Sequence, residues 1–486
     1  MISVRRALVL SFAERYLLVA LALAGVVTIA RLLTPNELGI YSVSLAVIGI
    51  AQVLRDFGIG NFLIQETNLT EDHIRTAFGL SLLLGAFLSV LVYLGAPWVG
   101  SIYAEPQLVE TLRIGALNLL VMPIGAISMA LLRRNMAFDR LLVVNVVAAA
   151  MGFASTIAFA LGGHGPNSMA IGSVVASAVT GIGSWLALSP RRLLLPSFSQ
   201  WRVFLHFGVQ SSVASVVTTI SMDINDLTLG KILGFTPLAI ISRAQGLMNL
   251  FHREVLGAVR NVALPAFAKA HREGEALESR HIAAVTNLTV IAWPFYGFLA
   301  LFSLEILRIM FGTQWDAAAG LVPYFALAGA LAATASLITT VMLAVGRIDL
   351  VVKSELIFQP IRAVLIVAAA LIFGTLQSCA TAYLLFFSAY APCMYAIKGR
   401  CVPNDVAAQV RHLWVSFKVS ILSLIFPASI AFYAGWGRNQ PLSVVTVITA
   451  AALLLVGWFV ALRWCRHPLV TDPLFRRLTT LLHRFV

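Results

Sequence analysis

Three arginines lie within or at the end of apolar stretches long enough to cross a bilayer. Arg243 and Arg362 lie inside such stretches, and Arg55 lies at the inner end of another. A charge at the middle of a bilayer costs at least about 2.5 kcal/mol, so ionisable residues there normally face protein or a water-filled cavity. A guanidinium stays charged and binds phosphate oxygens through paired hydrogen bonds. We therefore expect Arg243, Arg55 and Arg362 to bind an anionic substrate group.

Each of these arginines also has a structural explanation. Arg243 could pair with a helix end or an aspartate, and its loss would then lead to degradation of the protein. Arg362 could extend its charge toward the interface or form an internal pair. Arg55 could anchor the end of its span at the membrane surface. Both explanations stay open for all three residues.

Two carboxylates and an amide form a D-x-N-D cluster in a further apolar stretch, at Asp223, Asn225 and Asp226. Carboxylates inside a membrane are usually functional, and a pair of them can take up a proton or a sodium ion. Asp223 and Asp226 are therefore candidates for coupling transport to an ion gradient. The alternative is that Lys231, within two helical turns, neutralises one of them.

The composition identifies the class of protein that must position these charges. With 59% hydrophobic and 11% charged residues and a mean hydropathy of +0.90, the chain is an integral membrane protein. Its apolar runs are about 20 residues long, which fits membrane-spanning helices. The four cysteines have irregular spacings, so we expect no disulfide framework, no metal site and no cofactor.

The basic residues predict how the chain crosses the membrane. Hydropathy divides it into about 14 spans. With that division, 26 of the 34 lysines and arginines fall in loops or tails on one side. Cytoplasmic loops carry the excess of basic residues, so both termini are expected in the cytoplasm. This asymmetry also explains the net charge of +13 without nucleic acid as a partner.

The chain contains an internal repeat with an offset of 200 residues. RLLTPNELGIYS, from Arg31, aligns with KILGFTPLAIIS, from Lys231, and identities fall at four leucine, isoleucine and serine positions. In membrane proteins such repeats mark transporters whose substrate path runs between the halves. We expect an N-terminal lobe of six spans over residues 1–200 and a second over 201–400. Residues 401–486 are expected to form two more spans and a cytoplasmic amphipathic tail.

Helix-start and surface-helix signals accompany the repeat. Thr34-Pro35-Asn36-Glu37 is a capping box that predicts the start of the second span, and Thr236-Pro237 offers a similar start to the eighth. The connection at 253–280 and the tail at 472–486 both have the pattern of amphipathic helices on the inner leaflet. None of the loops is long enough to hold a soluble catalytic domain, so we expect a transporter and not an enzyme.

Three segments resemble one family. The stretch RLLTPNELGIYSVSLAVIGIAQVLRDFGIGNFLIQE resembles the N-terminal signature of bacterial polysaccharide transporters. ISRAQGLMNLFHREVLGAVRNVALPAFAK is similar to the signature of their second half. FGTQWDAAAGLVPYFAL resembles the G-x-x-W segment that follows the ninth span. These transporters are the lipid-linked oligosaccharide (O-antigen-type) flippases of the multidrug/oligosaccharidyl-lipid/polysaccharide exporter superfamily.

The resemblance implies two six-helix lobes that face each other in a V, followed by two helices. Alternating access between the lobes would move an undecaprenyl-diphosphate-linked oligosaccharide across the bacterial inner membrane, for exopolysaccharide, capsule or lipopolysaccharide biosynthesis. The expected partners are this substrate, the bilayer, and a polysaccharide polymerase and glycosyltransferases. We expect a monomer. Asp223 and Asp226 match no family motif.

Three other functions compete with this one. A cation-coupled multidrug or small-metabolite extruder on the same fold would need an apolar, acidic cavity, whereas the three arginines favour an anionic head group. A glycosyltransferase or polymerase would need a large loop with acid and base residues. A scaffold for envelope assembly would not need repeated halves with buried charges. We therefore expect Arg243 to bind the diphosphate, with Arg55 or Arg362 as a second contact.

Overall fold

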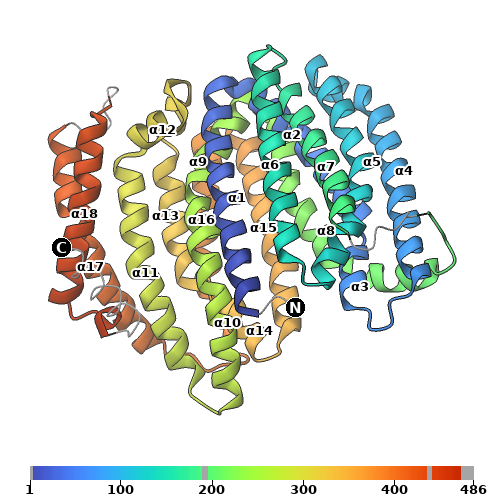
Figure 1. Cartoon of the computed structure of the whole chain (residues 1–486). Helices are drawn as coiled ribbons and strands as arrows, with labels where there is room; N and C mark the ends of the chain where they lie inside the picture. Colours follow the sequence, from blue (N-terminus) through green and yellow to red (C-terminus); the bar gives the residue numbers. More distant parts are fainter. Residues whose placement is uncertain (1–3, 189–194, 435–440, 472–486) are drawn as a thin grey trace. The chain divides into compact units, whose positions relative to one another are not determined.

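The computed structural model describes residues 4–188, 195–434 and 441–471. Every regular element in these ranges is helical, which confirms the predicted all-α fold (Figure 1). The chain divides into two compact units, residues 1–239 and 240–486. The predicted lobe limits at residues 200 and 400 rest on the repeat and stay predictions.

The first unit consists of eight helices in its described part and the first turn of a ninth. Their bounds are α1 (Val4–Leu32), α2 (Pro35–Asp56), α3 (Ile59–Gln65), α4 (Glu71–Tyr103), α5 (Pro106–Arg134), α6 (Phe138–Leu161), α7 (Asn167–Ala187) and α8 (Trp201–Ile232). Within this unit α5 packs against α4 and α7, α6 packs against α1 and α7, and α2 packs against α8.

The second unit begins within α9 (Phe235–Phe251). The helices that follow are η1 (His252–Leu256, a π-helix), α10 (Gly257–Arg272), α11 (Leu277–Leu301), α12 (Ser303–Phe311), η2 (Thr313–Ala318), α13 (Val322–Ala335), α14 (Ile338–Ala344), α15 (Ile348–Phe373), α16 (Leu376–Lys398), α17 (Val406–Tyr433), α18 (Val444–Trp464) and η3 (Pro468–Thr471). Within this unit α11 packs against α13 and α17, α16 packs against α13 and α15, and α17 pairs with α18.

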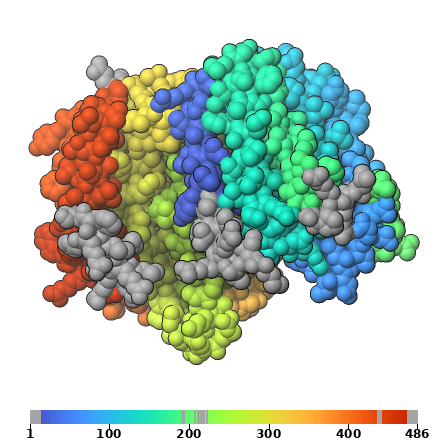
Figure 2. Space-filling view, viewed as in Figure 1, coloured from blue at the N-terminus to red at the C-terminus, as the bar shows by residue number. Residues whose placement is uncertain are grey.

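Twelve helical segments in the described ranges are long and apolar enough to cross a membrane. Helices α8 and α9 occupy the positions of the predicted seventh and eighth spans, so the count of 14 stays a prediction. The surfaces of α17 and α18, red in Figure 2, carry exposed apolar side chains such as Phe432 (72%), Val445 (72%) and Trp464 (77%). Such exposure suits contact with lipid. The predicted tail helix lies outside the described residues.

The predicted capping box is confirmed at the start of α2. The Glu37 amide donates to the Thr34 hydroxyl (3.3 Å), and the Thr34 amide donates to the Glu37 carboxylate (2.7 Å). In the second copy α9 begins at Phe235, one residue before the predicted cap at Thr236, and directly after Gly234, whose φ is +96°. A φ in that range is readily adopted only by glycine, so the helix of the second copy begins after a glycine turn and not at the predicted cap.

The connection after the eighth span, predicted as a separate surface helix, is instead a continuation of α9. α9, η1 and α10 follow one another without a break from Phe235 to Arg272, and α10 packs on α14 and α11. The π-helix inserts an extra residue per turn at His252–Leu256, which shifts the register of the side chains that follow. As a result, Arg260 belongs to a helix packed inside the second unit and not to a loop.

Candidate functional site

The first unit contains a cavity of about 570 Å³, called here the first cavity. Its lining includes Arg55 and Asp56 at the end of α2, Arg133 at the end of α5, and Asn145 on α6. Polar groups from three helices therefore converge on one hollow. This size falls within the range of about 300–1,000 Å³ that is typical of ligand-binding sites.

The break between α2 and α3 positions Arg55. Phe57 and Gly58 follow α2 with φ values of 36° and 67°, and both line the first cavity. A bulky residue with positive φ is strained, and strain of this kind is concentrated at functional sites. The turn ends α2 directly after Arg55 and Asp56, so both side chains are placed at the edge of the cavity.

Arg55 is almost fully buried but only partly satisfied. Its side chain is 3% exposed, and its Nε donates to Oδ1 of Asp56 at 3.1 Å. Its Nη2 also contacts that oxygen, while Nη1 is buried without a hydrogen-bond partner in the described structure. A buried donor without a partner costs about 1–3 kcal/mol. An anionic ligand in the first cavity would remove that cost.

The second unit contains a smaller cavity of about 230 Å³, called here the second cavity. Two interrupted helices border it: the π-helix η1 contributes His252, and the break between α13 and α14 contributes Ser336. Arg260 of α10 donates to the Ser336 carbonyl (3.1 Å), which lies at this break. Interrupted helices in transporters line binding sites, because the freed backbone groups need polar partners.

Helix α15 places several polar side chains in the second cavity. Glu355, Gln359 and Arg362 all line it, at positions one and two helical turns apart. The Gln359 amide nitrogen donates to the Glu355 carboxylate at 2.7 Å. The amide oxygen of Gln359 and Nε of Arg362 are buried without partners in the described structure. The structure therefore places Arg362 in the lining of a polar cavity, and its contact with substrate stays a prediction.

Arg243 has different surroundings from the other two arginines. Its guanidinium lies 4.7 Å from the ring centres of both Phe311 and Trp315, within the second unit. A cation over an aromatic face is stabilised by the ring quadrupole, most strongly when desolvated. Arg243 lines neither the first nor the second cavity, and its Nε is buried without a partner in the described structure. The predicted contact between Arg243 and substrate stays a prediction.

The aspartates of α8 approach α2 within the first unit. A Cβ atom added at Gly49 would lie 2.8 Å from Oδ2 of Asp223, so this carboxylate sits directly against the backbone of α2. Asn225, in the same cluster, has a buried amide oxygen without a partner in the described part of the chain. The Lys231 amine donates to the Ile102 carbonyl, which gives that lysine a partner other than the aspartates.

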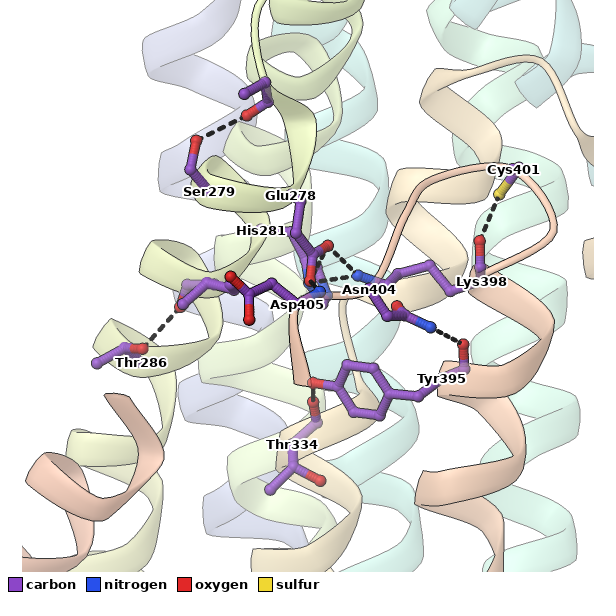
Figure 3. A network of polar contacts seen from close by, with 12 residues as sticks. Glu278, Ser279, His281, Thr286, Thr334, Tyr395, Lys398, Cys401, Asn404 and Asp405 are labelled. Carbon is purple, nitrogen blue, oxygen red and sulfur yellow. Dashed lines mark hydrogen bonds and ion pairs between the residues drawn. The ribbon is translucent and has the colours of Figure 1, made fainter. Parts of the chain in front are cut away.

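A third polar cluster, in the second unit, was not predicted from the sequence (Figure 3). Lys398, at the end of α16, is fully buried, and its amine contacts Glu278 and, at 3.4 Å, Nδ1 of His281. The other Glu278 oxygen accepts from the Asp405 amide (3.2 Å). Glu278 and His281 lie in the first turns of α11, and Asp405 precedes α17. The cluster therefore joins the ends of three helices in the second unit.

The missed residues lie where hydropathy gives no signal. Arg260 lies in the connection that the sequence predicts to be a surface helix, Lys398 is counted with the basic residues of the loops, and Glu278 and Glu355 lie near the ends of spans. Charges near span ends are normally solvated at the interface. Only the continuation of α9 into α10 and the contact of Lys398 with Glu278 show that these charges are enclosed.

Comparisons with known proteins agree with this architecture. A family model described as polysaccharide biosynthesis protein matches residues 28–320. The lipopolysaccharide biosynthesis protein WzxC of Escherichia coli (strain K12) is 22% identical over 464 residues, which cover 94% of this chain and 92% of that protein. The teichuronic acid biosynthesis protein TuaB of Bacillus subtilis (strain 168) is 25% identical over 304 residues, 62% of each chain.

Two solved structures have the same fold. The lipid II flippase MurJ, in an inward closed conformation, superposes with a TM-score of 0.70 at 13% identity, over 94% of this chain and 99% of that chain. An inward-facing multidrug transporter of the MATE family superposes with a TM-score of 0.62 at 16% identity, over 81% and 94% of the two chains. The family model described above matches more than half of the sequence, which confirms the predicted family. The chain belongs to the polysaccharide biosynthesis protein family.

Proposed function

We propose that this protein is a flippase that moves an undecaprenyl-diphosphate-linked oligosaccharide across the bacterial inner membrane by alternating access. The observation that carries the proposal is the first cavity, whose lining includes the buried Arg55, a residue with one donor that has no partner among the described residues. Relatives that are named for polysaccharide biosynthesis or its transport support it, among them the succinoglycan biosynthesis transport protein ExoT of Rhizobium meliloti (strain 1021). The flippase MurJ supports it through its fold.

The proposal covers the chain's partners and its lack of catalysis. We propose that it acts as a monomeric transporter, that a polymerase and glycosyltransferases work on the same substrate, and that no reaction is catalysed. Cells without the protein are expected to lose a surface or secreted polysaccharide while its lipid-linked unit accumulates on the inner leaflet. Normal export together with increased drug sensitivity would favour the extruder, and failure to make the lipid-linked unit would favour an enzyme.

We propose that Arg243 also contacts the diphosphate, because a guanidinium inside a span needs an anionic partner to offset its desolvation. Arg243→Ala is expected to abolish export at normal membrane abundance, and Arg243→Lys to restore part of it, since an ammonium keeps the charge but loses the paired geometry. Export and immunoblot levels are measured together. Its packing on Phe311 and Trp315 allows a purely structural role, which predicts loss of export only in proportion to loss of protein.

We propose that Asp223 and Asp226 take up the coupling ion. The approach of Asp223 to α2 means that binding a proton or sodium ion would change a contact between two helices of the first unit. Asp223→Asn and Asp226→Asn, which keep the side-chain shape, are expected to reduce transport into proteoliposomes and to remove its dependence on an imposed proton or sodium gradient. Transport that keeps its full gradient dependence in both variants would rule out this role.

We propose that both termini are cytoplasmic. The reason is the concentration of 26 of 34 basic residues on one side. A cysteine that replaces His164, between α6 and α7, should react with an impermeant maleimide added outside intact cells, and one that replaces Glu275, before α11, should react only after lysis. The opposite labelling pattern would reverse the orientation.

A further inference from the structure

The lining of the second cavity offers both a hydrogen-bond donor and an acceptor that lack partners within the described residues. Nε of Arg362 is a buried donor without an acceptor, and the Gln359 amide oxygen is a buried acceptor without a donor, in the described structure. The orientation of that amide is fixed, because its nitrogen donates to the Glu355 carboxylate. Sugar hydroxyl groups can satisfy both atoms. An ionised diphosphate diester can satisfy only the arginine, because it has no hydrogen to donate.

Aromatic rings form one wall of the second cavity. Tyr383, Phe387 and Tyr390 lie on one face of α16, with ring centres 5.0 Å apart for the first pair and 5.7 Å for the second. Aromatic faces are apolar and carry partial negative charge, so the C–H face of a pyranose packs well against them. The volume of about 230 Å³ is below the range of about 300–1,000 Å³ for drug-sized ligands. It suits one sugar ring.

The charged groups of the lining select among sugars. Arg260 and Arg362 supply two guanidinium groups, and Glu355 supplies one carboxylate, so positive charge is in excess among the described residues. A neutral sugar would leave this excess uncompensated in a partly dehydrated site. A carboxylate on the sugar would compensate it and accept paired hydrogen bonds from a guanidinium.

We propose that the second cavity binds one sugar unit of the transported oligosaccharide, and that this unit is a uronic acid. The assignment rests on the proposed flippase function and adds the class of glycan. Arg362 contacts the carboxylate of the sugar, Gln359 and Glu355 accept from its hydroxyl groups, and the rings of α16 cover one face.

The test measures binding to the purified full-length protein in lipid nanodiscs by titration calorimetry. The probes are lipid-free oligosaccharides that contain glucuronate or galacturonate in α or β linkage, their matched forms with a neutral hexose, and inorganic diphosphate. At least one uronate probe is expected to bind about tenfold or more tightly than its neutral match, the lower end of what a hydrogen bond to a charged group contributes. Arg362→Gln should abolish that preference.

The matched control is Lys353→Gln, which removes an exposed charge from α15 outside the second cavity. It should leave the preference unchanged. Equal binding within every matched pair, or no binding of any oligosaccharide, contradicts the proposal. The proposal is also contradicted if diphosphate is the one probe that binds and Arg362→Gln abolishes that binding, because the cavity would then bind the diphosphate of the carrier lipid. Restoration of export to a deletion strain by the wild-type gene is scored separately, so failure of the sugar assignment is distinct from failure of the flippase function.

Discussion

Arg55→Ala is expected to stop polysaccharide export while the protein remains in the membrane at normal abundance. The variant removes the buried guanidinium whose Nη1 has no partner within the described structure. Its hydrogen bonds within the described structure are to Asp56, whose side chain is 63% exposed and can be solvated, so few polar contacts are lost. A hydrogen bond to a charged group is worth about 1.5–3 kcal/mol, and a diphosphate offers more than one. Export of polysaccharide is measured alongside immunoblot levels.

Two further variants separate binding from structural pairing at this site. Arg55→Lys should recover only part of the export, because an ammonium lacks the planar pair of donors. Asp56→Asn removes the counter-charge but keeps a side-chain oxygen that can accept from Arg55 and keeps the guanidinium in the first cavity, so export should be largely retained. If Asp56→Asn abolishes export as fully as Arg55→Ala at normal protein abundance, the ion pair itself is what matters and Arg55 does not bind substrate.

Breaking the buried Lys398–Glu278 pair should give the largest loss of stability among the changes considered. Lys398→Ala leaves Glu278, 15% exposed, without its principal counter-charge. Removing one partner of a buried pair typically costs about 3–5 kcal/mol. The apparent melting temperature of the purified protein in detergent should fall by several degrees. The loss should be smaller for Arg347→Ala, which breaks the exposed Arg347–Asp349 pair, because surface pairs contribute about 0–1 kcal/mol.

The double variant Lys398→Met, Glu278→Leu distinguishes a lost pair from a lost side-chain volume. It replaces both charges by apolar groups, which is often neutral for a buried pair. Most of the melting temperature lost in Lys398→Ala should therefore return, apart from the hydrogen bond that Glu278 accepts from the Asp405 amide. A double variant as unstable as the single one would contradict this explanation, because it would show that the loss of stability does not come from an unpaired Glu278 carboxylate.

Local signals in the sequence predicted much of the helical framework. Thr34 and Glu37 form the expected cap, because a capping box depends only on residues three apart. A second, weaker similarity in the sequence, between AFDRLLVV from Ala137 and RIDLVVK from Arg347, coincides with helix starts, since α6 begins at Phe138 and α15 at Ile348. Hydropathy located the spans because lipid exposure requires long apolar runs.

The candidate sites were only partly predictable, because they depend on contacts between distant segments. Arg362 and Arg55 were found as charges in or at the end of apolar runs, and each lines a cavity. Arg260 was not found, because a π-helix continues α9 into α10 and brings it to the second cavity. Lys398 was counted with the loop residues, although it is fully buried through a partner 120 positions away.

The most direct test of the flippase function uses purified protein in proteoliposomes that hold an undecaprenyl-diphosphate-linked oligosaccharide in one leaflet. Appearance of the oligosaccharide in the opposite leaflet is followed by its accessibility to an added glycosidase. Wild-type protein is expected to make the substrate accessible much faster than protein-free liposomes do, and Arg55→Ala is expected to match the protein-free rate. Equal rates with and without the wild-type protein, under an imposed proton or sodium gradient, would contradict the proposed function.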